Sequence, residues 1–138
     1  MGRLLDLVEA YYDACNSGEA ERVRACFAPD AVHWFTRLPP ARGADAIAAQ
    51  FAGSVERLHA RWTVEHGIEQ GEEACVEWTM RWRDPDTGAE RLDRGTEWYL
   101  FDGDLIFEVR AYHHSSPKNR SGDLVGFDHA ARGHAVLR

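Results

Sequence analysis

The sequence predicts an α+β fold, a cone-shaped two-layer arrangement in which three N-terminal helices pack on a curved antiparallel sheet. Apolar residues recur every three to four positions up to Leu58 and every second position from Trp62 onward. Helices followed by antiparallel strands are typical of two-layer α+β domains. We expect the bent sheet and the short helices to enclose a cavity, which is a natural site for a small molecule.

The first half of the chain holds three helical patterns. The predicted helices cover roughly residues 4–17, 19–27 and 44–58, and a short extended piece lies at 32–35. Gly18 can adopt the left-handed conformation that ends the first helix, and Pro29 follows the second. Asp45 suits the positive end of the third helix.

The second half alternates apolar and polar residues. The predicted strands cover residues 62–69, 74–83, 90–101 and 105–114. Asp, Pro and Gly residues at 84–88 and 102–104 predict turns between them. Residues 115–138 form a Gly- and Ser-rich tail, which we interpret either as a packing strap or as a lid in which Phe127 caps the cavity. Neither a repeat nor a domain boundary is visible, so residues 1–138 are predicted to form a single domain.

Composition narrows the class of protein. The chain has 138 residues and a net charge of −7, which argues against a nucleic-acid partner. No stretch has the length and apolarity of a membrane span, and the N-terminus lacks the pattern of a signal peptide. Three single cysteines suggest reduced thiols, so we expect a cytoplasmic protein. Adjacent His113 and His114 point to opposite faces of a strand, so no metal site is predicted.

Four segments resemble the nuclear transport factor 2-like superfamily, especially its SnoaL-like polyketide cyclase and ketosteroid isomerase branches. They cover residues 11–18, 26–31, 43–47 and 102–112. The resemblance implies the cone-shaped fold, a pocket for a hydrophobic small molecule without a cofactor, and a homodimer formed through the outer sheet face. It does not fix the reaction, because this fold hosts isomerases, dehydratases, cyclases, epoxide hydrolases and non-catalytic binding proteins.

The resemblance also suggests roles for particular residues. Tyr11 matches the oxyanion-hole tyrosine of ketosteroid isomerase, and Glu97 matches the neutral acid beside it. Phe35 replaces the general-base aspartate of that enzyme, and His66 lies near a pocket histidine of scytalone dehydratase. The catalytic set of limonene epoxide hydrolase falls near Glu77, Thr79 and Ala111, which excludes that mechanism.

Glu97 is the leading candidate from the residues themselves. It shares a strand face with Tyr99 and Phe101, so burial would raise its pKa and keep it protonated near neutrality. A neutral carboxylic acid can donate a hydrogen bond to a developing enolate. Alternatively, Glu97 faces outward and pairs with Arg81 or Arg110.

Two further choices stay open in the sequence. Tyr11 and Tyr12 diverge by about 100° on a helix, so only one should face the interior, and Tyr11 is favoured. On the strand at 74–83, either Glu77 or the apolar row on the opposite face points into the cavity. That apolar row is Val76, Trp78, Met80 and Trp82. If the apolar row instead faces outward, it would form the dimer interface.

These observations predict a cofactor-independent enzyme, namely an isomerase, dehydratase or cyclase, that acts on a hydrophobic carbonyl compound by acid–base chemistry. The alternative is a non-catalytic binding protein for an apolar metabolite. The candidate catalytic residues are Tyr11, His33, His66, Glu77, Glu97 and His113. The candidate ligand-binding residues are Phe35, Phe51, Tyr99, Phe107, Ala111 and Phe127.

Overall fold

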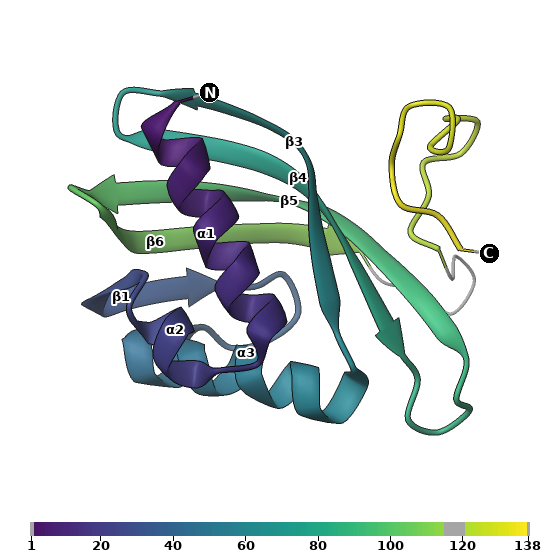
Figure 1. Cartoon of the computed structure of the whole chain (residues 1–138), viewed down its shortest axis with the longest axis horizontal. Coiled ribbons are helices and arrows are strands. Elements are labelled where there is room, and N and C mark those ends of the chain that lie inside the picture. The colour runs from purple at the N-terminus through teal and green to yellow at the C-terminus, as the bar shows by residue number, and fades with distance from the viewer. Residues whose placement is uncertain (1, 115–120, 138) are drawn as a thin grey trace.

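The computed structural model describes residues 2–114 and 121–137, and it confirms the α+β prediction (Figure 1). In these residues three helices lie on one side of a curved, open sheet of six strands. The helices are α1 (Arg3–Ser17), α2 (Ala20–Arg24) and α3 (Ala44–Leu58). The strands are β1 (Phe27–Trp34), β2 (Ala41–Arg42), β3 (Arg61–Gln70), β4 (Glu73–Arg83), β5 (Glu90–Asp102) and β6 (Leu105–His114).

The sheet has the strand order β2-β1-β6-β5-β4-β3, and only β1 and β6 are parallel among these neighbours. The predicted second helix was too long, because α2 ends at Arg24 and Phe27 begins β1. Phe27 pairs with Ile106 of β6, so tertiary pairing overrides the helical pattern there. Pro29 lies where the β1–β6 register shifts, a position that tolerates a residue without an N–H donor.

Helix α1 buries both of its neighbouring tyrosines, so the expectation that only one could face the interior was wrong. Tyr11 is 1% exposed and Tyr12 is 4% exposed. Tyr11 makes edge contacts with Phe27 and Phe51 and belongs to the core. Tyr12 instead reaches the sheet, where its hydroxyl donates to Glu97. Both are buried because α1 contacts β3 and β4 on one side and α2 and α3 on another.

Strand register shows which face of β4 lies under the helices. Trp78 pairs with Gly95 of β5, and Gly95 pairs with His113 of β6, so these three share a row. Trp78 is 6% exposed and lines the interior cavity. Glu77 is exposed on the opposite, outer face. The tryptophan row of β4 therefore does not form the outer-face dimer contact considered above.

Residues 121–137, called the strap below, pack on the outer face of the sheet. The Arg94 guanidinium of β5 donates to Asp123 at 2.9 Å and to the Ala135 carbonyl at 2.7 Å. The Ala135 N–H donates in turn to the Glu65 carboxylate of β3 at 2.7 Å. These contacts tie the strap to β3 and β5 from the side opposite the helices.

The strap position decides between the two interpretations of the tail. Phe127 packs against His129 within the strap, with ring centroids 4.6 Å apart, and does not line the interior cavity. The lid interpretation of Phe127 was therefore wrong, and residues 121–137 act as a packing strap. Residues 115–120 and 138 of the predicted tail lie outside the described residues.

Candidate functional site

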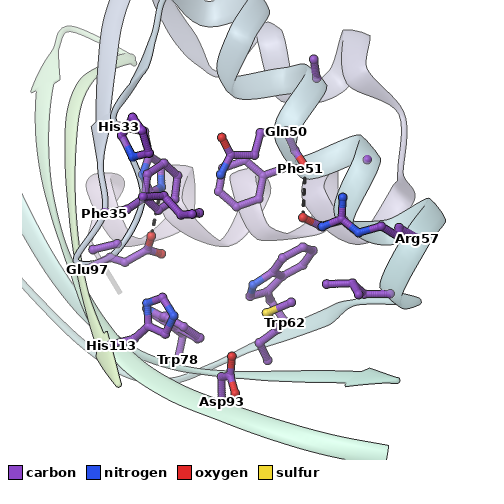
Figure 2. Close-up of a pocket in the computed structure, with 18 residues that line it drawn as sticks. His33, Phe35, Gln50, Phe51, Arg57, Trp62, Trp78, Asp93, Glu97 and His113 are labelled. Carbon is purple, nitrogen blue, oxygen red and sulfur yellow. Dashed lines mark hydrogen bonds and ion pairs between the residues drawn. The ribbon is translucent and has the colours of Figure 1, made fainter. Parts of the chain in front are cut away.

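A cavity of about 560 Å³ lies between α3 and the inner face of the sheet (Figure 2). Its volume is in the range of pockets that bind small molecules. The largest apolar side chains in its wall are Phe35, Phe51, Trp62, Trp78 and Met80. The principal polar side chains are His33, Gln50, Arg57, Asp93, Glu97 and His113. The wall is thus mainly aromatic, with a small number of convergent polar groups.

Glu97 is 6% exposed and is held at one wall of the cavity by two hydroxyl donors and by the neighbouring imidazole of His33. The hydroxyls of Tyr12 and Tyr99 both donate to Oε1, the latter at 2.8 Å. Oε2 lies 3.2 Å from Nε2 of His33 (Figure 2). One carboxylate therefore joins α1, β1 and β5.

The pKa of Glu97 reflects two opposing effects. Burial, the largest influence, raises it, whereas the hydrogen bond and charge of His33 and the hydrogen bonds from Tyr12 and Tyr99 lower it. The net result is a pKa below the ordinary value, so Glu97 is a carboxylate. The expectation of a neutral acid was wrong because these three partners are not visible in the strand pattern.

The two tyrosines beside Glu97 keep their protons. Burial, and then the charge of Glu97, raise the pKa of Tyr99 and of Tyr12 well above the usual value for tyrosine. Both hydroxyls therefore stay protonated near neutral pH and donate hydrogen bonds to Glu97. Their role in the structure is to stabilise the charged form of Glu97.

His33 comes from β1, where it pairs with Ala41 and Val109 of the neighbouring strands. Its ring is fully buried and stacks on Phe35, with centroids 4.3 Å apart. Stacking and strand pairing fix the ring, so that Nε2 faces Glu97. This geometry suits His33 to positioning Glu97 and to stabilising its charge.

A second polar group lies further along the same sheet face. His113 and Trp78 have ring centroids 5.4 Å apart, on either side of Gly95. Figure 2 shows both rings below Glu97, with Asp93 beyond them and Arg57 on the α3 side of the cavity. Arg57 is exposed, so a positive charge lies where the cavity meets solvent.

The structure brings together only part of the predicted site. The candidates that line the cavity are His33, Phe35, Phe51, Glu97, Ala111 and His113. Tyr11 and Tyr99 are buried beneath it in the core. His66 and Glu77 are exposed and pair with each other across β3 and β4, outside this cavity. Phe107 is 40% exposed and also does not line it.

Several cavity residues were not selected from the sequence. Trp78 belongs to β4, whose inward face the alternation left open, and Trp62 and Asp93 lie on β3 and β5 and were not selected as candidates. Gly95 carried a usable signal, because a glycine inside a strand pattern often marks a close approach of neighbouring groups. Tyr12 carried none, since nothing local distinguishes it from Tyr11.

The described residues give no sign of a metal centre or of a membrane-spanning helix. They contain no group of three or more His, Cys, Asp or Glu side chains that could hold a metal ion. Each described helix is too short or too polar to cross a bilayer. What the cavity offers chemically is one tethered carboxylate among aromatic rings, with further nitrogen donors beside it.

Comparison with known proteins agrees with this architecture. The SnoaL-like domain model matches residues 8–109. A protein of unknown function with a cystatin-like fold from Methylobium petroleophilum is 31% identical, with a TM-score of 0.72 over 98% of this chain and 92% of that one. No curated protein gives a significant match.

More distant structures share the fold. A protein proposed to be a polyketide cyclase, from Xanthomonas campestris, is 20% identical, with a TM-score of 0.71 over 81% of this chain and 90% of that one. A protein with a ketosteroid isomerase-like fold from Catenulispora acidiphila, solved in complex with trimethylamine, is 14% identical, with a TM-score of 0.73 over 83% of this chain and 88% of that one. With its fold, its cavity and the family match over most of its length, the chain belongs to the SnoaL-like domain family.

Proposed function

We propose that the protein is a cofactor-independent enzyme that moves a proton on a hydrophobic carbonyl compound, as isomerases, dehydratases and cyclases do. The observation that carries this proposal is Glu97, a buried carboxylate at the wall of an aromatic cavity. The hydroxyls of Tyr12 and Tyr99 and the adjacent imidazole of His33 keep it charged and fixed in position. A positioned carboxylate is a sufficient base for removing a proton next to a carbonyl group.

In this mechanism Glu97 is the general base. Its free lone pairs take a proton from the carbon beside the carbonyl, and the C–H electrons form the C=C bond of an enolate. The carboxylic acid then returns the proton to the same or another carbon. Tyr12 and Tyr99 lie outside the cavity wall, and together with His33 they position the carboxylate. Glu97 thus takes the role of the aspartate that Phe35 replaces, instead of donating as an acid.

The second candidate function is non-catalytic binding of an apolar metabolite. It is favoured by the aromatic wall and by His33, whose ring nitrogens are both inaccessible to solvent. In that case Glu97 would contribute only to ligand affinity and to cavity shape. The two functions differ in whether the protein accelerates loss of a carbon-bound proton.

Deuterium exchange separates them. We would incubate 2-tetralone, an apolar enolisable ketone, with the protein in D₂O and follow loss of its α-proton signals by NMR. The parent protein should accelerate exchange over buffer. Glu97→Gln should lose about two to four orders of magnitude of that acceleration, whereas Glu56→Gln, on the exposed side of α3, should retain it.

The outcome that contradicts the enzyme is specific. If 2-tetralone binds, as shown by broadening of its signals, but exchanges at the buffer rate, the binding function is the better account. If Glu97→Gln exchanges the ketone as fast as the parent, another group is the base and the assignment of Glu97 fails.

We also propose a homodimer through the outer sheet face. Ile68, Trp98 and Tyr112 are 62%, 40% and 57% exposed there, and the strap covers only the part of that face near Arg94. A stable interface buries about 1,600 Å² in total. Light scattering at micromolar concentration should give twice the chain mass, and Trp98→Glu should give the monomer. A monomeric parent protein would contradict this proposal.

A further inference from the structure

The proposed reaction needs a group that stabilises the oxygen of the enolate, and the expected donors are not available. Tyr11 is a core residue outside the cavity wall. Tyr12 and Tyr99 already donate to Glu97. Glu97 is itself negatively charged and would repel an oxyanion. The donors to the substrate oxygen must therefore come from elsewhere in the cavity wall.

Three cavity residues carry buried ring nitrogens without a hydrogen-bond partner among the described residues. They are His33, through Nδ1 and Nε2, Trp78, through Nε1, and His113, through Nδ1. Nε2 of His33 faces Glu97, so Trp78 and His113 are the two that remain for the substrate oxygen. An indole N–H can only donate, and a neutral imidazole has one N–H that donates. Leaving such a donor unpaired in the interior costs about 1–3 kcal/mol. A substrate oxygen bound at this position would remove that cost.

The sheet places these rings beside Glu97 in a regular way. Glu97 pairs with Val76 and Ala111, and the next row on the same face is Trp78, Gly95 and His113. Rows on one face of a strand are about 7 Å apart. That spacing fits one functional group of a substrate between the carboxylate and the two rings.

Gly95 makes the approach of the two rings possible. A Cβ atom at this position would lie 2.6 Å from Cβ of His113 and 2.7 Å from Cζ2 of Trp78. Any larger residue would force the rings apart or away from the sheet. The absence of a side chain at position 95 thus allows the indole of Trp78 and the imidazole of His113 to pack close together above Gly95.

We propose that Trp78 and His113 form the oxyanion site of this cavity, which binds the carbonyl oxygen of the substrate. This inference rests on the proposed function and names its ligand class, a neutral carbonyl compound whose oxygen becomes negatively charged. When Glu97 removes the proton, the π electrons of the carbonyl move onto oxygen, where the N–H groups of both rings donate to it. Return of the proton to carbon restores the carbonyl and releases the donors.

Binding of 4-nitrophenol tests the site without turnover. The phenolate mimics an enolate oxygen, and nitrobenzene is a neutral control of similar shape. The parent protein should bind the phenolate more tightly than nitrobenzene, measured by titration above the pKa of the phenol. Trp78→Phe, which keeps a ring but removes the N–H, should weaken phenolate binding about tenfold or more and nitrobenzene binding less than about threefold.

Matched variants separate donation from packing. His113→Phe should also weaken phenolate binding, and His113→Asn, which retains an N–H donor, should recover part of the loss. Trp34→Phe removes an indole N–H from an exposed residue outside the cavity wall and should leave phenolate binding within about threefold. Near-ultraviolet circular dichroism confirms that each variant is folded.

Two results would overturn the oxyanion site. One is a parent protein that does not prefer the phenolate to nitrobenzene. The other is an equal effect of Trp78→Phe on both ligands, which means that the ring only packs. Failure of the proposed function is distinguishable, because Glu97→Gln would then leave deuterium exchange unchanged. If both proposals hold, Glu97→Gln abolishes exchange and strengthens phenolate binding, since it removes a nearby negative charge.

Discussion

Gly95→Ala should destabilise the protein through the close approach of Trp78 and His113. The added methyl group would lie 2.6 Å from Cβ of His113, 2.7 Å from Cζ2 of Trp78 and 2.7 Å from the carbonyl oxygen of Tyr112. The Tyr112 oxygen is backbone and Cβ of His113 is anchored to it, so neither moves without disturbing β6. Overpacking of this kind costs about 1–3 kcal/mol. Because backbone is among the contacts, we expect about 2 kcal/mol or more.

Urea unfolding followed by circular dichroism measures this cost as a lower midpoint with an unchanged slope. Heating should show a fall in the melting temperature on the order of 5–10 °C. Gly53→Ala is the matched control, because a Cβ there has no neighbour within 4 Å and the residue lies inside α3. It should stabilise the protein by about 0.5–1 kcal/mol. A Gly95→Ala protein as stable as the parent would refute the close packing of the two rings.

Two further predictions concern the donors around Glu97. Tyr12→Phe should lower the free energy of unfolding by about 1.5–3 kcal/mol, because it removes a hydrogen bond to a charge. Tyr11→Phe should lower it by less. Equal losses of the two variants in urea unfolding would contradict the assignment of Tyr12 as a donor to Glu97. The pKa of Glu97 is lower in the folded than in the unfolded state, so its contribution to stability is present above about pH 4.3 and is lost as the pH falls through the folded value. The difference in the free energy of unfolding between the parent protein and Glu97→Gln should therefore shrink in acid. A difference that does not change with pH would contradict the lowered pKa of Glu97.

The fold was predictable because its signals are local. The change of hydrophobic period near position 60 and the turn residues at 84–88 and 102–104 place most helices and strands within a few residues. The start of β1 was not predictable, because Phe27 adopts an extended conformation only through its pairing with Ile106 of β6. Pairing between residues 79 positions apart leaves no mark in the local pattern.

The site was predictable only in part. Alternation placed Glu97 and His113 on one face, and that face lines the cavity. The charge of Glu97 was not predictable, because it depends on groups from α1 and β1 that are distant in the chain. Trp78 could not be assigned either, because the alternation along β4 does not show which face lies under the helices, and Thr79 on the opposite face is buried as well.

The most direct test of this account is the titration of Glu97 itself. With ¹³C-labelled glutamate, the carboxyl signal of Glu97 is assigned by its absence in Glu97→Gln and followed against pH by NMR. The tethered carboxylate predicts a midpoint below the ordinary value of about 4.3, and Tyr12→Phe should move it upward. A midpoint above that value in the parent protein would mean that burial dominates, that Glu97 is a neutral donor, and that the general-base mechanism is wrong.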